Sequence, residues 1–119
     1  MQYNQKVGKF GEDLACQYLL SKGYKIVRRN IKLSYQEIDI IAKIKEKIIF
    51  IEVKTRTSNV FGQADESFYK QKMKNLKKAL NIYLGGKKID PDNARLEFIA
   101  IDIDKIRKIA NIKHYKDLL

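Results

Sequence analysis

The sequence is poor in residues that interrupt or cross-link a chain. Its 119 residues include one cysteine (Cys16), one proline (Pro91) and six glycines. A single cysteine cannot form an internal disulfide, which predicts a reducing compartment. So few glycines and prolines leave little material for a linker. We therefore expect residues 1–119 to form one domain with a single hydrophobic core.

Long apolar runs and histidine are also scarce. No stretch of about 18 apolar residues occurs, and the first residues, MQYNQKVGKFGED, lack the apolar core of a secretory signal. We expect a cytoplasmic protein with no membrane partner. The only histidine, His114, is expected to be an exposed tail residue. The sequence thus lacks the Cys/His cluster of a zinc site and the Ser-His-Asp set of a hydrolase.

Positive charge, by contrast, is abundant. Twenty-five Lys and Arg against fourteen Asp and Glu give a net charge of +11 and a pI near 9.7. Such a surplus favours polyanionic partners, of which nucleic acid is the commonest. The alternative is a lysine-rich surface that reflects codon bias and carries no binding function.

Apolar periodicity predicts an αβββαβ order, an α/β fold with a mixed sheet. The expected helices cover 5–22 and 66–84, and the expected strands cover 24–31, 37–44, 47–56 and 96–102. Gly23 is a suitable helix stop, and Arg28-Arg29-Asn30 indicates an edge strand. A loop is expected over 57–64 and a turn at Pro91-Asp92, whereas 105–119 gives no clear element.

The two central strands are expected to form a hairpin that turns at Lys45-Glu46. Paired positions then sum to 91, so that Asp39 faces Glu52 and Glu37 faces Lys54. One face would be wholly apolar. It would carry Ile38, Ile40, Ala42, Ile49, Ile51 and Val53.

Two carboxylates in directly opposed positions repel each other unless a proton or a cation neutralises them. Mg²⁺ typically binds one or two carboxylates together with water and phosphate oxygens, so Asp39 and Glu52 are candidate metal ligands. Lys54, on the same face, could hold an attacking water or stabilise charge on a phosphate. The alternative is a solvated face with Glu37–Lys54 and Glu52–Arg56 salt bridges.

The two helices add charged side chains to this picture. Glu12 lies in line with the apolar stripe of the first helix and could point toward the two carboxylates as a third acidic ligand. Alternatively, it simply suits the first turn of a helix. The second helix carries a basic face, which beside a metal site would bind phosphates. We expect nucleic-acid contacts from Lys70, Lys72, Lys74, Lys77, Lys78 and Arg56. Lys72 lies at the margin of the apolar arc, from where it could reach the site or solvent.

The assembled residues resemble the PD-(D/E)XK nuclease superfamily, and most closely its uncharacterised YraN-like branch, which is similar to archaeal Holliday-junction resolvases. The matching segments are Gly11-Glu12, Ala15, Leu19-Leu20, Glu37 to Ala42, Phe50 to Arg56, Phe61-Gly62, Lys72, Tyr83-Leu84 and Arg95 to Ile101. Three positions depart from the pattern. Ile38 replaces proline, Gln36 replaces glycine, and Glu97 replaces an aspartate in the late strand.

The resemblance implies a restriction-endonuclease-like fold and Mg²⁺- or Mn²⁺-dependent hydrolysis of phosphodiester bonds. It implies that Asp39, Glu52 and Glu12 are metal ligands and that Lys54 is the catalytic lysine, while Glu37 is a possible accessory residue. DNA is favoured over RNA as the partner, with branched repair or recombination intermediates as candidate substrates. Cutting two strands symmetrically would call for a homodimer. The alternative function is a non-catalytic nucleic-acid-binding module or adaptor that retains the nuclease fold.

Overall fold

The computed structural model describes residues 3–33, 36–57, 66–85 and 90–116. Within them the elements are α1 (Tyr3–Ser21), β1 (Lys25–Leu33), β2 (Gln36–Ile44), β3 (Lys47–Arg56), α2 (Glu66–Gly85), the 3₁₀ helix η2 (Pro91–Asn93), β4 (Ala94–Asp104) and β5 (Ile109–Tyr115). The predicted αβββαβ order and α/β class are confirmed. Strand β5 comes in addition. Most of the loop expected over 57–64, with its Phe61-Gly62 motif, lies outside the described residues.

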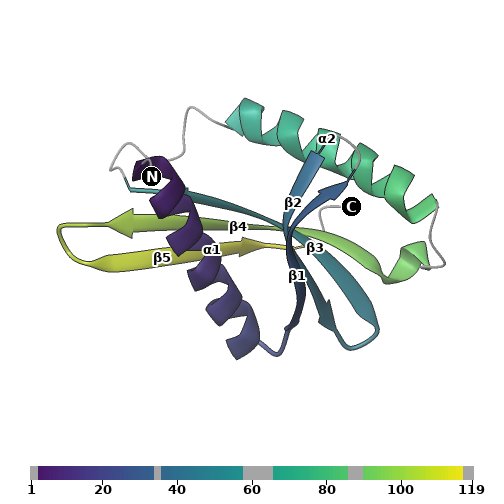
Figure 1. Cartoon of the computed structure of the whole chain (residues 1–119), viewed down its shortest axis with the longest axis horizontal. Helices are drawn as coiled ribbons and strands as arrows, with labels where there is room; N and C mark the ends of the chain where they lie inside the picture. The colour runs from purple at the N-terminus through teal and green to yellow at the C-terminus, as the bar shows by residue number, and fades with distance from the viewer. Residues whose placement is uncertain (1–2, 34–35, 58–65, 86–89, 117–119) are drawn as a thin grey trace.

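The five strands form one mixed sheet in the order β1-β2-β3-β4-β5. Only β3 and β4 run parallel, because α2 connects them as a crossover, and the other neighbours are antiparallel. Strand β1 lies at an edge, as predicted. Figure 1 shows α1 crossing in front of β4 and β5, with α2 along another side of the sheet.

Helix α1 ends at the predicted glycine. Gly23 has φ of 93°, a left-handed conformation that glycine adopts without steric cost. The Gly23 N–H donates to the Leu20 carbonyl, and the Tyr24 N–H donates to the Leu19 carbonyl, both close to 3 Å. These two bonds form a Schellman motif, and Leu19 and Tyr24 pack in the same cluster. The motif thus sets the angle at which β1 enters the sheet.

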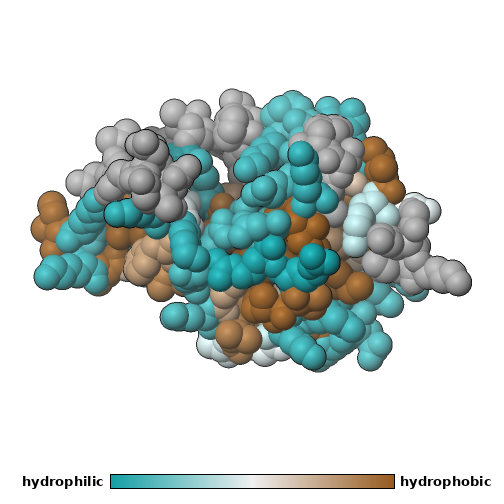
Figure 2. All heavy atoms as spheres, viewed as in Figure 1, coloured by the Kyte–Doolittle hydropathy of each residue, from teal (hydrophilic) through white to brown (hydrophobic). Residues whose placement is uncertain are grey.

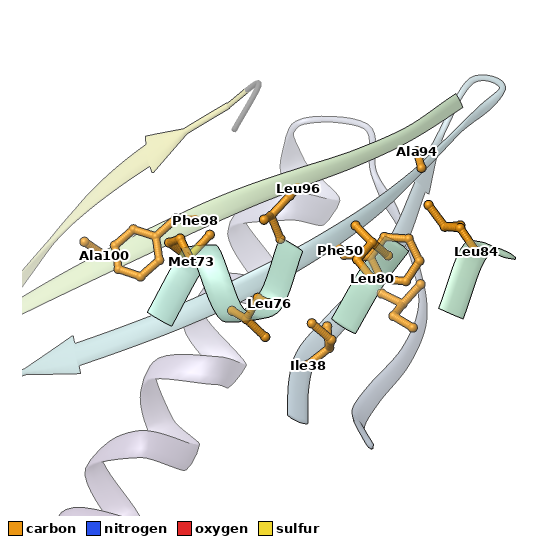
Figure 3. Packing of buried hydrophobic residues seen from close by; sticks show 11 residues of the cluster. Ile38, Phe50, Met73, Leu76, Leu80, Leu84, Ala94, Leu96, Phe98 and Ala100 are labelled. Atoms are coloured by element: carbon orange, nitrogen blue, oxygen red, sulfur yellow. The ribbon is translucent and has the colours of Figure 1, made fainter. Parts of the chain in front are cut away.

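Each helix covers one face of the sheet with its own hydrophobic cluster. The cluster beneath α1 contains Ala15, Leu19, Tyr24, Ile40, Ala42, Ile49, Ile51, Ile99 and Ile101. The cluster beneath α2 contains Ile38, Ile41, Phe50, Met73, Leu76, Leu80, Leu84, Ala94, Leu96, Phe98 and Ala100. Figure 3 shows Met73 near Phe98 and Leu84 near Ala94, so α2 runs antiparallel to β4. The start of α2 therefore lies near the end of β4, which places Lys72 over the carboxyl half of β3.

The prediction for Ile38 was wrong, because this side chain packs beneath α2 and not with Ile40 beneath α1. The β1–β2 ladder passes from the Arg29–Ile40 pair to the Ile31–Ile38 pair, and the intervening Asn30 has φ of 55°. This left-handed residue interrupts the alternation of the pleat. On β2 itself, Ile38 and Ile40 point to opposite faces although they are two residues apart, so the alternation is also broken at Asp39.

The prediction for His114 was also wrong, because its side chain is only 5% exposed. His114 Nε2 lies 2.7 Å from Glu97 Oε1, which also accepts a hydrogen bond of 2.9 Å from the Tyr24 hydroxyl. His114 Nδ1 lies 3.1 Å from the Tyr18 hydroxyl. This buried network of four side chains ties β5 to β4 and to α1.

The face shown in Figure 2 carries both polar and apolar residues. Figure 2 shows hydrophilic residues over much of the viewed face, with an apolar patch at the left, where Figure 1 places the tip of the β4–β5 hairpin. Ile106 lies in that turn and is 88% exposed. In the described part of the chain, neither helix combines the length and the apolar character that crossing a membrane requires.

Helix α1 approaches β3 most closely at Gly11. A Cβ atom built on Gly11 would lie 1.7 Å from Thr55 Oγ1, whereas one built on Gly8 would meet nothing within 4 Å. Only glycine therefore fits at this crossing. The close approach brings the next residue, Glu12, down to the sheet.

We expect Gly11→Ala to destabilise the fold by about 1–3 kcal/mol, because α1 or Thr55 must move to admit the methyl group. The matched control, Gly8→Ala in the same helix, should raise stability by up to about 1 kcal/mol through helix propensity. Urea unfolding of both variants measures the difference. Equal effects of the two substitutions would show that Gly11 makes no such close contact.

We expect His114→Ala to lower the free energy of unfolding by about 1–3 kcal/mol, because it leaves the buried Glu97 carboxylate without its imidazole donor. Asn111→Ala, an exposed change in the same strand, is the control and should cost little. Thermal unfolding of the two variants at neutral pH compares them. A His114 variant as stable as the Asn111 control would contradict a buried network.

Candidate metal centre

The hairpin of β2 and β3 has the predicted register near its turn, but the predicted Asp39–Glu52 and Glu37–Lys54 pairs are not part of the ladder, and Glu37 pairs with Lys32 of β1 instead. Pairing runs from Ile44–Lys47 through Ile41–Phe50 to Ile40–Ile51, always summing to 91. Beyond this pair, the side chain of Asp39 replaces a main-chain acceptor. Its Oδ2 accepts a hydrogen bond of 2.7 Å from the Val53 N–H. The Asp39 carboxyl group is thereby held between the two strands, beside Glu52.

Glu52 is a buried carboxylate, 2% exposed, in register with Phe98 of β4 on the face that α2 covers. Lys72 of α2 places its Nζ 3.1 Å from Glu52 Oε2. Of the two positions left open for Lys72, the structure therefore shows the one at the site. The ammonium balances charge but does not meet hydrogen-bond geometry, so Glu52 Oε2 is buried without a hydrogen bond.

Burial and the adjacent Glu52 raise the pKa of Asp39 from its ordinary 3.8 to about 8. A hydrogen bond between the two carboxyl groups and their mutual repulsion act in the same direction, while the Val53 N–H and Lys72 oppose them. Without a cation, Asp39 thus retains its proton at neutral pH. The two opposed carboxyl groups are coupled, as the cross-strand register predicts.

Glu12 approaches this pair from α1. Burial, and next the charge of Asp39, raise the pKa of Glu12, whereas hydrogen bonds from Arg29 and Asn30 lower it. Arg29 Nη2 lies 3.4 Å from Glu12 Oε1 and 2.9 Å from Asp13 Oδ1. Helix α1 therefore brings Glu12 within electrostatic reach of Asp39, with Arg29 holding it from β1.

The donor set suits a hard divalent cation. Carboxylate oxygens are the preferred ligands of Mg²⁺, and the buried Glu52 Oε2 has an acceptor position free of hydrogen bonds. Residues 3–33, 36–57, 66–85 and 90–116 contain no group of three His, Cys, Asp or Glu side chains close enough to hold a metal ion together. Within the described residues, Glu12 therefore does not form a three-carboxylate group with Asp39 and Glu52.

The remaining candidates lie around this centre. Lys54 is exposed, two residues beyond Glu52 on the same face, and Arg56 follows half-buried. Glu37 is exposed at the start of β2, where it pairs in register with Lys32 of β1. The basic face of α2 is exposed at every described position. These positions are Lys70, Lys74, Lys77 and Lys78.

The sequence interpretation missed Arg29 and Asn30 as parts of the site. Both lie in a polar run that was interpreted only as the mark of an edge strand. Their register with β2 carries the missing information, because Arg29 pairs with Ile40 and Asn30 follows directly beside Asp39. Cys16 offers no alternative nucleophile, since burial raises the pKa of its thiol.

The raised pKa of Asp39 has a consequence for stability. The folded metal-free protein keeps a proton that the unfolded chain releases above its ordinary pKa of 3.8. The free energy of unfolding should therefore fall as the pH rises from about 4 to about 8. Asp39→Asn cannot ionise and should match or exceed the wild type in thermal stability at pH 8 in the presence of EDTA.

Thermal unfolding of both proteins across this pH range measures the effect. Asp92→Asn, at an exposed position in η2, is the control and should keep the wild-type pH dependence. Parallel pH profiles for the wild type and Asp39→Asn would contradict a protonated Asp39.

Comparison with known proteins places this site in a family. Residues 11–103, which include Glu12, Asp39, Glu52 and Lys54, match the model of the uncharacterised protein family UPF0102. A UPF0102 protein of Alkaliphilus oremlandii is 38% identical over 96% of this chain and 97% of its own length. One of Thermodesulfovibrio yellowstonii is 43% identical over 89% and 94%, and one of Syntrophomonas wolfei is 47% identical over 68% and 70%. The chain therefore belongs to the uncharacterised protein family UPF0102.

Proposed function

We propose that this protein is a Mg²⁺-dependent nuclease that hydrolyses phosphodiester bonds in DNA, with Mn²⁺ as a substitute metal. The observation that carries the proposal is the pair formed by the half-buried Asp39 and the buried Glu52, in which one oxygen of Glu52 lacks a hydrogen bond. Burying two carboxyl groups in contact costs stability, and a divalent cation offsets that cost. Branched repair or recombination intermediates are the substrate class that the PD-(D/E)XK resemblance suggests.

In this proposal each side chain has a distinct task. Asp39 and Glu52 would hold the metal, and Glu12 would add a third acidic group beside them. The bound cation would supply an activated water and stabilise negative charge on the phosphate. Lys54, exposed at the edge of the site, orients that water or stabilises the charge that develops on the phosphate oxygens.

Lys72 has a separate task as the counter-charge of Glu52. Its ammonium lies 3.1 Å from Glu52 Oε2 and supplies a positive charge next to this buried carboxyl group. Lys72 thus partly offsets the negative charge of the pair while no metal is bound. Binding of the metal must release the Asp39 proton, so the affinity for Mg²⁺ should increase as the pH rises toward 8.

A purely nucleic-acid-binding module explains the same basic surface but not the buried carboxyl pair. Acidic groups repel the phosphates that such a module must hold. A binder would therefore gain from neutral side chains at both positions.

Calorimetric titration with Mg²⁺ and Mn²⁺, paired with cleavage of branched, single-stranded and duplex DNA, tests the proposal. We expect binding and cleavage in the wild type, and loss of both in Asp39→Asn and Glu52→Gln. Lys54→Ala should retain metal binding and lower the cleavage rate by about 100-fold or more. Lys47→Ala, an exposed lysine at the opposite end of β3, is the matched control and should behave as the wild type.

Three outcomes would defeat the proposal. Metal binding that survives Asp39→Asn and Glu52→Gln would place the metal elsewhere. DNA binding with neither metal binding nor cleavage would identify a non-catalytic module. Cleavage that persists in Asp39→Asn and Lys54→Ala would indicate a contaminating nuclease.

A further inference from the structure

Strand β5 extends the face that carries the carboxylates. Residues in register on neighbouring strands share a face, and Phe98 and Ala100 fix that face as the one beneath α2. Three rows therefore cross β3, β4 and β5 on this side. They are Glu52–Phe98–Tyr115, Lys54–Ala100–Lys113 and Arg56–Asp102–Asn111. We call these three rows the β5 shelf.

The orientation of β5 is fixed by the opposite face of the sheet. His114 is buried beneath α1 in its network with Glu97 and Tyr18. Because side chains alternate along a strand, Lys113 and Tyr115 must point to the shelf. Both are exposed there, Tyr115 by 45%.

The middle row has the character of a phosphate site. Lys54 and Lys113 lie on strands two apart, about 10 Å between their backbones, on either side of the small Ala100. Beside Ala100 is a hollow of about 330 Å³, which Asp102, Asn111, Ile112 and Lys113 also line. Figure 3 shows Ala100 at the outer end of the cluster beneath α2, beyond Phe98.

The first row adds an aromatic surface at the level of Glu52. The Tyr115 ring packs against the Phe98 ring with centroids 5.9 Å apart and an angle of 36° between the planes. Its remaining surface faces solvent. A half-exposed aromatic ring beside basic groups is the arrangement on which single-stranded nucleic acid stacks its bases, and a base paired inside a duplex cannot use it.

The rows contain one acidic residue besides Glu52. Asp102 lies in the third row, in register with Arg56 of β3, which supplies a positive charge at the same level. The shelf thus carries three basic side chains, Lys54, Arg56 and Lys113, against two acidic ones, and its middle row is wholly free of acidic residues.

From this arrangement we propose that the β5 shelf binds an unpaired strand, with one base stacked on Tyr115 and the backbone phosphates held by Lys54 and Lys113. This inference rests on the proposed nuclease function and assigns its substrate class. The enzyme would act on single-stranded DNA, or on the unpaired arm of a branched molecule. Neither Lys113 nor Tyr115 contacts the metal, so both are substrate-positioning residues.

The test measures binding by the full chain in EDTA, where no cleavage occurs. The probes are a fluorescein-labelled oligothymidylate of about 15 nucleotides and a duplex of the same length. We expect the single strand to bind more tightly. Tyr115→Leu, which keeps an apolar contact with Phe98 but has no aromatic face, should weaken single-strand binding at least about fivefold and leave duplex binding unchanged. Tyr115→Phe should retain wild-type binding.

Lys113→Ala should reduce the slope of log K against log salt by about 0.7, the value for one phosphate contact on a single strand. Lys47→Ala is the matched control and should leave the slope unchanged. Tighter binding of the duplex, or wild-type binding by both Tyr115→Leu and Lys113→Ala, would overturn the inference.

The Mg²⁺ titration separates this inference from the nuclease proposal. Both positioning variants should bind Mg²⁺ as the wild type does, since their side chains lie outside the carboxyl pair. Single-strand binding that depends on Tyr115 in a protein that binds no metal would support the shelf and defeat the nuclease. Metal-dependent cleavage that is unchanged by substitution of Tyr115 or Lys113 would support the nuclease and defeat the shelf.

Discussion

The hydrogen bond from the Val53 N–H to the Asp39 carboxyl group is the contact on which the candidate site depends. It occurs where the β2–β3 ladder stops after the Ile40–Ile51 pair, and it spares the main-chain donor from being left unsatisfied. The same contact fixes Asp39 beside the buried Glu52. One bond therefore both ends the hairpin ladder and brings together two groups that repel each other. The Val53 N–H has its acceptor, but Asp39 is held next to Glu52, which raises the pKa of Asp39.

That pair is tolerated because it lies between two hydrophobic clusters that hold the backbone from both sides. The two residues that precede Glu52 in β3 belong to different clusters. Phe50 packs beneath α2, and Ile51 packs beneath α1. Glu12 lies on α1 next to Gly11, where this helix contacts β3. Lys72 lies on α2 and contacts Glu52. The charged groups thus converge from three layers onto one point of the sheet. A site of this kind weakens the metal-free fold locally, and the surrounding packing compensates for the loss.

The hairpin and its register from Ile40–Ile51 to the turn were predictable because their information is local. Lys45-Glu46 and an unbroken apolar alternation are enough to define a register. The prediction failed for Ile38, because the alternation of β2 is broken at Asp39 and Ile38 packs beneath α2. It failed again for His114, whose burial depends on Tyr18, 96 residues away in the sequence. Apolar periodicity is read over short stretches of sequence and does not show contacts between distant segments. A lone histidine near the end of the chain was therefore interpreted as a tail residue.

Strand β5 shows why this second failure matters for function. Its alternation assigns His114 to the core and its two neighbours, Lys113 and Tyr115, to the surface beside β4. An exposed edge strand would otherwise be free to slip in register, and a slip of one residue would exchange the two faces. The Glu97–His114 contact of 2.7 Å opposes that exchange, since it is satisfied in one register only. The buried histidine thus acts at a distance from the carboxyl pair, by keeping a lysine and a tyrosine on the face where Glu52 lies.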